Sequence, residues 1–531
     1  MKIFTSIWMV IVFAIVLTGI RIDNSDTVKT LRYKTWDHFQ QVEPRQAVSD
    51  KVVVINITES DIKKYGQWPW PRHILAMFHA NLTDSGAVLV NYNILFAEAD
   101  RMSGKEYLKN FPFPAEVREQ LAVILADTDK VFAFAIKESK NVVLMSSVKN
   151  NADNVIPSTV PIIEKGNVLP WLYEYSGIVS PLTQLAAGAR GIGVNVTSPE
   201  PDAVVRKMPV LIRIGQKIYP SMLLENIRIL NRSKRIKVIA KEHGINEVLV
   251  SKKASVPVNH NAEMYINYAE PFKYTQLTVE EVFSGEHIDK IKGKIVVVGI
   301  DAAGLSVLKY TPHGLTTDQM ITAQALDTTM TGKYLFRVPQ ADTYEILFMS
   351  FLLLLLILVI PRTSVLLAVP LLFFVEIGVA YGAFMAYSNK GFLIDPSFIM
   401  LAVFLIWSHS TYNNFATQSR LKKQIKKQFE HQMLAVLTAS QMQSELAMLN
   451  EQLTKESLPN IKVGIGINSG EALVGNMGSD QRFDYSVIGD PVNLAARLES
   501  ASKTLGHTLI VGEATKKVID DKFPFEFVDR I

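Results

Sequence analysis

Cysteine is absent from this chain of 531 residues. Disulfide bonds, thiolate nucleophiles and zinc or iron–sulfur sites with cysteine ligands are therefore excluded. An excess of either charge sign is also lacking, because 55 lysine and arginine residues against 51 aspartate and glutamate residues leave a formal net charge of +4. Nucleic-acid binding usually depends on a clustered basic excess, so we expect no nucleic-acid partner. A chain of this length should contain two or more domains.

The hydrophobic residues are concentrated in four runs, which cover residues 3–20, 344–360, 365–387 and 398–412. Runs of this kind cross, or nearly cross, the hydrocarbon core of a bilayer. The first run is longer than the apolar part of a usual signal peptide and no cleavage pattern follows it, so we interpret it as a retained anchor in contact with membrane lipid. The sequence predicts a multidomain membrane protein with four transmembrane helices.

Basic residues beside the runs predict the orientation of the chain. They are Lys2, Arg362, Arg420, Lys422, Lys423, Lys426 and Lys427. With four crossings all of them lie on one side, which the positive-inside rule assigns to the cytoplasm. We therefore expect a multi-pass protein of the plasma (inner) membrane, with residues 23–340 outside and residues after 413 inside.

The outer segment has the pattern of an α/β or α+β domain. Apolar runs such as "KVVVINI" (51–57) and "GKIVVVGI" (293–300) predict buried strands, and "PRHILAMFHANLTDSG" (71–86) predicts a covering helix. Residues 59–100, 191–230, 291–305 and 311–335 resemble the CHASE sensor domain of the second type. The resemblance implies an extracytoplasmic sensor of an unknown ligand, placed before a cyclase, kinase or phosphodiesterase.

Two polar features of the outer segment have a structural and a ligand-binding interpretation. In "WPWPR" (68–72) the tryptophans fill a core while Pro71 begins a helix, or else they stack on a ligand beside Arg72. We favour the structural interpretation, because buried tryptophan is more often packing than recognition. Asp202 and Arg206 likewise predict a turn and a local ion pair rather than a binding clamp.

The membrane segment contains one acidic residue in its interior, Glu376. It either transmits a signal or makes a structural hydrogen bond between helices, and we favour the second interpretation. Residues 413–459 form a helical connector with apolar residues at helical spacing. This connector is a dimeric coiled coil, a helix that packs on its own domain, or two helices that follow one another.

Residues 460–531 alternate short strands and helices. The glycines between Gly464 and Gly478 match neither a P-loop nor a dinucleotide fingerprint, so we interpret them as strand and hairpin glycines. Residues 462–506, with "VIGDPVNLAARLE" at 487–499, closely resemble the C-terminal half of a class III adenylate/guanylate cyclase catalytic domain. The resemblance implies an α+β ferredoxin-like fold, a head-to-tail homodimer or heterodimer, ATP or GTP as substrate, and Mg²⁺ or Mn²⁺ as cofactor.

Three residues match positions of that family's nucleotide site. The resemblance implies that Asn493 orients the ribose and that Arg497 stabilises charge on the triphosphate, as catalytic residues. Ser486 stands where the family reads the adenine edge and is the expected substrate-binding residue, with ATP favoured over GTP. The alternative is a purely structural role, in which Asn493 caps its helix and Arg497 pairs with a surface acid.

Aspartate is missing where the cyclase family needs it. No aspartate lies between Asp395 and Asp480, and neither metal-binding motif of the family is present. We interpret this as the loss of the N-terminal half of the catalytic domain, with a junction near residues 431–433, so the chain has no expected metal ligands. The domain plan is an anchor (1–22), a sensor (23–340), three transmembrane helices (341–412), a connector (413–459) and a truncated cyclase domain (460–531). The prediction is a receptor-type nucleotidyl cyclase that is inactive alone, and the alternative is a non-catalytic sensor or regulatory protein.

Overall fold

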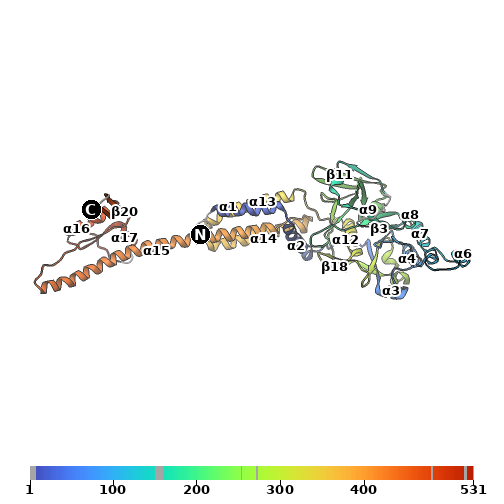
Figure 1. Ribbon diagram of the computed structural model, residues 1–531, viewed down its shortest axis with the longest axis horizontal. Coiled ribbons are helices and arrows are strands. Elements are labelled where there is room, and N and C mark those ends of the chain that lie inside the picture. Colours follow the sequence, from blue (N-terminus) through green and yellow to red (C-terminus); the bar gives the residue numbers. More distant parts are fainter. Residues whose placement is uncertain are drawn as a thin grey trace. The chain divides into compact units, whose positions relative to one another are not determined.

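The computed structural model describes residues 7–149, 160–252, 254–270, 273–479, 482–519 and 523–529. The chain divides into two compact units (Figure 1). One unit is Val10–Ser408, and the other combines Met1–Met9 with His409–Ile531. The first contains the predicted outer domain and most of the hydrophobic runs.

A seven-stranded sheet forms the centre of the outer domain. Its strand order is β15-β1-β16-β2-β3, and both β6 and β7 pair with β3. The strands are β1 (Val52–Thr58), β2 (Leu89–Tyr92), β3 (Val142–Val148), β6 (Ile178–Val179), β7 (Gly191–Asn195), β15 (Thr275–Thr278) and β16 (Ile295–Asp301). All pairs are parallel except β3 with β6. The predicted strands 51–57 and 293–300 are the neighbours β1 and β16.

Helices cover both faces of this sheet, as continuous apolar strands require. One face packs on α4 (Arg72–Asp84), α7 (Thr128–Ser139), α8 (Thr183–Gly188) and α10 (Val279–Ser284). The other packs on α9 (Met222–Leu230) and α12 (Asp318–Thr331). Alternate residues of β1 supply the two cores, since Val53 and Ile55 face the first set of helices and Val54 faces the second. The predicted α/β class of the outer domain is confirmed.

Smaller elements complete the outer domain. A four-stranded sheet contains β4 (Ile162–Lys165), β11 (Ile236–Lys241), β12 (Gly244–Ser251) and β13 (Ala254–Val256). A three-stranded sheet contains β5 (Glu174–Tyr175), β9 (Leu211–Ile214) and β10 (Lys217–Pro220), and two pairs are β8 (Lys207–Pro209) with β14 (Glu263–Tyr265) and β17 (Leu308–Thr311) with β18 (Gly314–Thr317). The remaining helices are α3 (Glu59–Tyr65), α5 (Gly104–Asn110), α6 (Ala115–Ile124) and α11 (Ile288–Ile291).

The hydrophobic runs form helices that pack together in the same unit. These are α1 (Ile7–Asp23), α13 (Ala341–Val359), α14 (Val365–Lys390) and the first turns of α15 (Ser397–Lys455), with Leu17, Leu353, Leu372 and Val403 in a shared buried cluster. Among the described residues, two segments are long and apolar enough to cross a membrane, Ala341–Arg362 and Leu366–Lys390. A third span results if α1 and α2 (Asp26–Val42), which are bent by 80°, count as one. Two of the four predicted spans therefore correspond to candidate membrane helices, while the first run belongs to the bent pair and the fourth run, at the start of α15, is not among the candidates.

The C-terminal unit contains part of α15 and a small α/β assembly. The connector is one continuous helix within the 59 residues of α15. Its later part packs on its own domain, since Gln443 Nε2 donates to the Val463 carbonyl at 2.9 Å and Asn450 Nδ2 donates to the Ile461 carbonyl at 2.8 Å. The strands are β19 (Ile465–Ile467) with β22 (Leu509–Val511) and β20 (Leu473–Ser479) with β21 (Arg482–Ile488), and the helices are α16 (Asp490–Leu505) and α17 (Glu513–Ile519). The described strands thus form two separate pairs instead of the single sheet of the predicted ferredoxin-like fold.

Candidate functional site

The three predicted nucleotide-site residues lie in one strand–turn–helix segment of the C-terminal unit. Ser486 is on β21, opposite Gly475 of β20. Gly489 ends the strand and caps α16, whose first turn contains Pro491, a residue suited to a helix start. Asn493 and Arg497 follow on α16, one helical turn apart.

Asn493 and Arg497 project from the open face of α16. Both side chains are exposed, and neither makes a hydrogen bond or ion pair with the described residues. Because Gly489 is the N-cap residue, Asn493 does not cap the helix, and Arg497 has no acidic partner in the described part of the chain. The alternative role of Asn493 as a helix cap is therefore wrong, and no acidic partner of Arg497 lies among the described residues.

Glycines set the opposite face of α16 against the strands. A Cβ atom on Gly466 would lie 2.2 Å from the Ala495 carbonyl oxygen, and one on Gly464 would lie 2.1 Å from Ser502 Oγ. These glycines therefore permit close contact between strand and helix, and Gly475 belongs to the β20–β21 hairpin. The interpretation as strand and hairpin glycines is confirmed.

Among the described residues no group of metal ligands accompanies Asn493 and Arg497. The part of the chain that the structure describes contains no group of three or more histidine, aspartate or glutamate side chains that could hold a metal ion. The described donor set does not fit the two-metal chemistry of the cyclase family.

A largely buried group of six charged residues in the other unit, with Asp342 at its exposed edge, was not predicted from the sequence. The group comprises Arg21, Arg32, Arg337, Asp342, Glu345 and Asp395. Arg21 Nη2 donates to Glu345 Oε2 at 2.6 Å, and Arg32 Nε donates to Asp395 Oδ2 at 3.1 Å. Asp395 is fully buried and also accepts the backbone N–H of Ser397, which begins α15. This charged cluster therefore ties the start of α15 to α1, α2 and α13. The available signal was opposite charges beside successive hydrophobic runs.

The "WPWPR" stretch has the structural role that we favoured. Trp70 is buried in the core beneath α4 and donates its indole N–H to the Gly66 carbonyl at 2.7 Å, while Pro71 is the N-cap residue of α4. The Arg72 guanidinium is buried, lies over the Phe96 ring and pairs with Asp129. Its charge is compensated inside the protein and is not available to a ligand.

The predicted pair of Asp202 and Arg206 is present, with Nη2 and Oδ2 2.6 Å apart. A second partner, Asp37 on α2, was not predicted and accepts two hydrogen bonds from Arg206 at 2.7 Å. The hydrogen bond from Arg206 lowers the pKa of Asp202. Burial opposes the charge of Arg206, but its bonds to both carboxylates raise its pKa overall. Helix α2 thus contacts both the outer domain and the charged cluster.

Glu376 of α14 is half-buried, and its Oε1 atom has no hydrogen-bond partner in the described residues. The favoured hydrogen bond between helices is therefore not formed by this atom.

Two protein-family models match the chain, one in its N-terminal region and one in its C-terminal region. A family model described as the CHASE2 domain matches residues 9–358, which is more than half of the chain. The chain belongs to the CHASE2 family. A second family model, the adenylate and guanylate cyclase catalytic domain, matches residues 413–531, so the CHASE2 region is followed by a cyclase-type sequence.

Curated relatives match only short stretches of this CHASE2 protein. Over 102 residues it is 34% identical to an adenylate cyclase of Anabaena cylindrica. The matched stretch covers 18% of this chain and 20% of that relative. Over 58 residues it is 41% identical to an uncharacterized protein of Mycobacterium tuberculosis (strain ATCC 25618 / H37Rv), covering 11% of this chain and 10% of the relative. The chain thus spans a fifth or less of these relatives' lengths. No solved structure matches the chain.

Proposed function

We propose that the chain is a membrane receptor in which an extracytoplasmic CHASE2 sensor controls a class III nucleotidyl cyclase domain in the cytoplasm. The observation that carries this proposal is the open face of α16, where Asn493 and Arg497 are exposed without partners in the described residues. An amide and a planar multi-donor cation one turn apart suit a ribose and a triphosphate. The hydroxyl of Ser486 can donate or accept and is therefore compatible with the adenine edge, and we propose ATP as the substrate with GTP as the alternative.

The proposed placement is the plasma (inner) membrane, with four crossings. The two candidate spans, the bent pair α1–α2 and the apolar start of α15 support this topology. Basic residues on the cytoplasmic side then follow the positive-inside rule.

The cyclase reaction requires a partner chain in this proposal. The chain supplies Ser486, Asn493 and Arg497 to a shared site, but its described residues offer no carboxylate set for Mg²⁺ or Mn²⁺. A homodimer is therefore inactive, and a heterodimer with a complete cyclase domain has metal ligands from the partner. The proposal also includes the loss of the N-terminal half of the catalytic domain near residues 431–433 and a remaining half that begins at residue 460.

A non-catalytic sensor or regulatory protein of cyclase descent is the second candidate. The same lack of metal ligands favours it, since such a protein needs the outer sensor and the dimer surface but no chemistry.

Membranes that contain the full chain test both candidates with ATP or GTP and Mn²⁺, alone and with a complete class III cyclase chain. We expect no cyclic nucleotide from the chain alone. When the complete cyclase chain carries a substitution that weakens its own activity, addition of this chain should raise the amount of cyclic nucleotide. Asn493→Ala should abolish that increase, whereas Lys503→Ala, on an exposed residue of α16, should leave it unchanged. Product from the chain alone would overturn the required partner, and no response in the mixed membranes would favour the non-catalytic candidate.

A further inference from the structure

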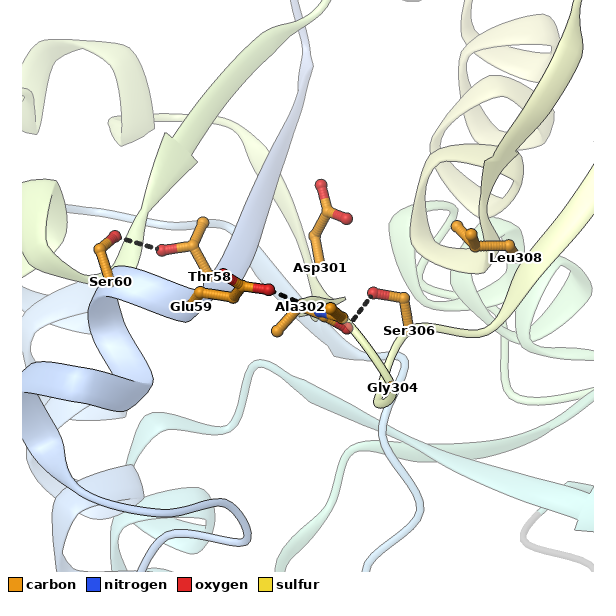
Figure 2. Close-up of a pocket in the computed structure, with 9 residues that line it drawn as sticks. Thr58, Glu59, Ser60, Asp301, Ala302, Gly304, Ser306 and Leu308 are labelled. Atoms are coloured by element: carbon orange, nitrogen blue, oxygen red, sulfur yellow. Dashed lines mark hydrogen bonds between the residues drawn. The ribbon is translucent and has the colours of Figure 1, made fainter.

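A cavity of about 490 Å³ opens at the carboxyl ends of β1 and β16 in the outer domain (Figure 2). Residues 58–60 line it on the β1 side, and residues 301–304, Ser306 and Leu308 line it on the β16 side. Its volume is in the range of pockets that hold small molecules.

The topology of the sheet explains why the cavity lies there. β1 and β16 are parallel neighbours, paired from Val52 with Ile295 to Thr58 with Asp301. After β1 the chain enters α3 and α4, and α4 covers one face of the sheet. After β16 the chain passes through β17 and β18 into α12, which covers the opposite face. Where the connections of adjacent strands diverge in this way, open α/β sheets have their ligand crevice.

The lining groups are acidic and rich in hydroxyls. Figure 2 shows the Asp301 carboxylate between Thr58 and Leu308. The hydrogen bonds drawn there join neighbouring residues and do not involve Asp301. Asp301 is exposed and has no hydrogen-bond or ion-pair partner in the described residues. Glu59 Oε1 accepts the Ala303 backbone N–H at 3.2 Å and retains further acceptor capacity. The Ser306 hydroxyl, which donates to the Ala302 carbonyl at 2.8 Å, can also accept.

The charge of the lining selects among ligands. Two carboxylates and no lysine or arginine line the cavity, so an anion is repelled and a cation attracted. Two carboxylates are too few for a protein cage around a divalent metal, and the described residues include no larger acidic group. A cation with several N–H donors matches carboxylate and hydroxyl acceptors better.

We propose that this cavity is the ligand site of the CHASE2 sensor and that it takes a small organic amine with several donors, of the polyamine or amino-sugar type. Asp301 and Glu59 bind the ammonium groups, and the hydroxyls of Ser60 and Ser306 accept the remaining donors. Control of the cyclase domain by this ligand would rest on the proposed cyclase function. Binding itself does not, because binding to the outer domain does not require nucleotide chemistry.

The test measures binding to the full chain in detergent by calorimetry and by the shift in melting temperature. The probes are spermidine, glucosamine, glucose and Mg²⁺, so that a polyamine, an amino sugar, a neutral sugar and a metal are distinguished. We expect one of the two amines to raise the melting temperature by several degrees at saturation. Asp301→Asn and Glu59→Gln should each weaken its binding about tenfold or more, because each removes a charge-assisted hydrogen bond.

Matched controls are Asp289→Asn and Glu242→Gln, which neutralise exposed acids outside the cavity. The controls should bind the amine as the unmodified chain does. The proposal is overturned if neither amine binds, if glucose or Mg²⁺ binds more tightly than both amines, or if the cavity variants bind like the controls. Because no cyclic nucleotide is measured, failure of the cyclase proposal does not affect this result.

Discussion

The central sheet of the outer domain and the strands of the C-terminal unit differ in how far their apolar side chains are covered. In β1, Val53, Val54 and Ile55 are all 0% exposed. In the C-terminal unit, Leu473 of β20 is 71% exposed and Ile488 of β21 is 53% exposed. The hydrophobic side chains buried there are few, and those described are Val436, Ala439, Leu498, Ile510 and Ile519.

The difference reflects what each sequence segment contains. The outer segment supplies strands on both sides of β1 and helices for both faces, so its sheet is closed to water on both faces. The C-terminal segment supplies two strand pairs, of which β19–β22 packs against α16, while Leu473 and Ile488 on β20–β21 remain exposed. Exposed apolar strands and unpaired edges are typical of a surface that another chain covers. The comparison therefore supports the proposal that another chain covers β20 and β21.

The largest test of the comparison replaces one phenylalanine in each unit. Phe78→Ala should lower the free energy of unfolding of the outer domain by about 3–5 kcal/mol, because Phe78 is 0% exposed in the core under α4. Phe527→Ala in the C-terminal unit should change stability by less than about 0.5 kcal/mol, since Phe527 is 77% exposed. Thermal unfolding of the full chain in detergent, followed by circular dichroism, measures both. Equal effects would show that the two units are covered alike.

A second test removes a charge from the charged cluster. Arg21→Met should destabilise the Val10–Ser408 unit by about 3–4 kcal/mol, because Glu345, only 5% exposed, loses a close partner. The matched change Lys29→Met breaks the exposed pair with Asp26 and should cost about 0–0.5 kcal/mol. The same unfolding measurement applies. A small loss for Arg21→Met would mean that water reaches the cluster and screens its charges.

Local signals in the sequence predicted the elements of the outer domain. Continuous apolar runs bounded by glycine and lysine identified β1 and β16, and Pro71 before an amphipathic run identified α4. The pairing of the strands was not predictable from these runs, since β1 pairs with β16, which is far away in the chain. For the same reason the ion pair of Arg21 with Glu345, separated by 324 positions, was missed.

In the C-terminal unit a motif predicted more than periodicity did. The resemblance picked out Ser486, Asn493 and Arg497, and the structure places Ser486 on β21 and the other two on α16. The ferredoxin-like sheet was expected from the resemblance, but the described strands form two separate pairs. The roles of Ser486, Asn493 and Arg497 stay predictions.

A third test examines packing in the C-terminal unit. Gly466→Ala should destabilise this unit by about 2–3 kcal/mol, because the new Cβ meets the Ala495 backbone oxygen, which cannot rotate away as a side chain can. Gly378→Ala on α14, where no atom lies within 4 Å, is the matched control and should not destabilise the chain. Limited proteolysis of the C-terminal unit, whose rate follows the population of the open form, measures the change. An unchanged cleavage rate would show that α16 does not rest on these glycines.

The smallest expected effect is a pH dependence confined to the buried core of the outer domain. Burial lowers the pKa of His79 to about 4, from an ordinary value of 6.5. Above pH 6.5 the side chain is neutral in both the folded and unfolded states. As the pH falls below 6.5, the unfolded state takes up a proton that the folded state resists, so stability is lost. Between pH 7 and pH 5 this loss should be about 1–2 kcal/mol.

The variant His79→Gln separates this titration from others in the chain. It removes the imidazole that contacts Ser139 and Tyr92, so its absolute stability falls. The diagnostic measurement is the slope of stability against pH, which should become shallower between pH 7 and pH 5. His73→Gln on the exposed side of the same helix should keep the original slope. If both variants keep the original slope, His79 is protonated within the folded core. The helices then cover this part of the sheet less completely than the burial of β1 implies.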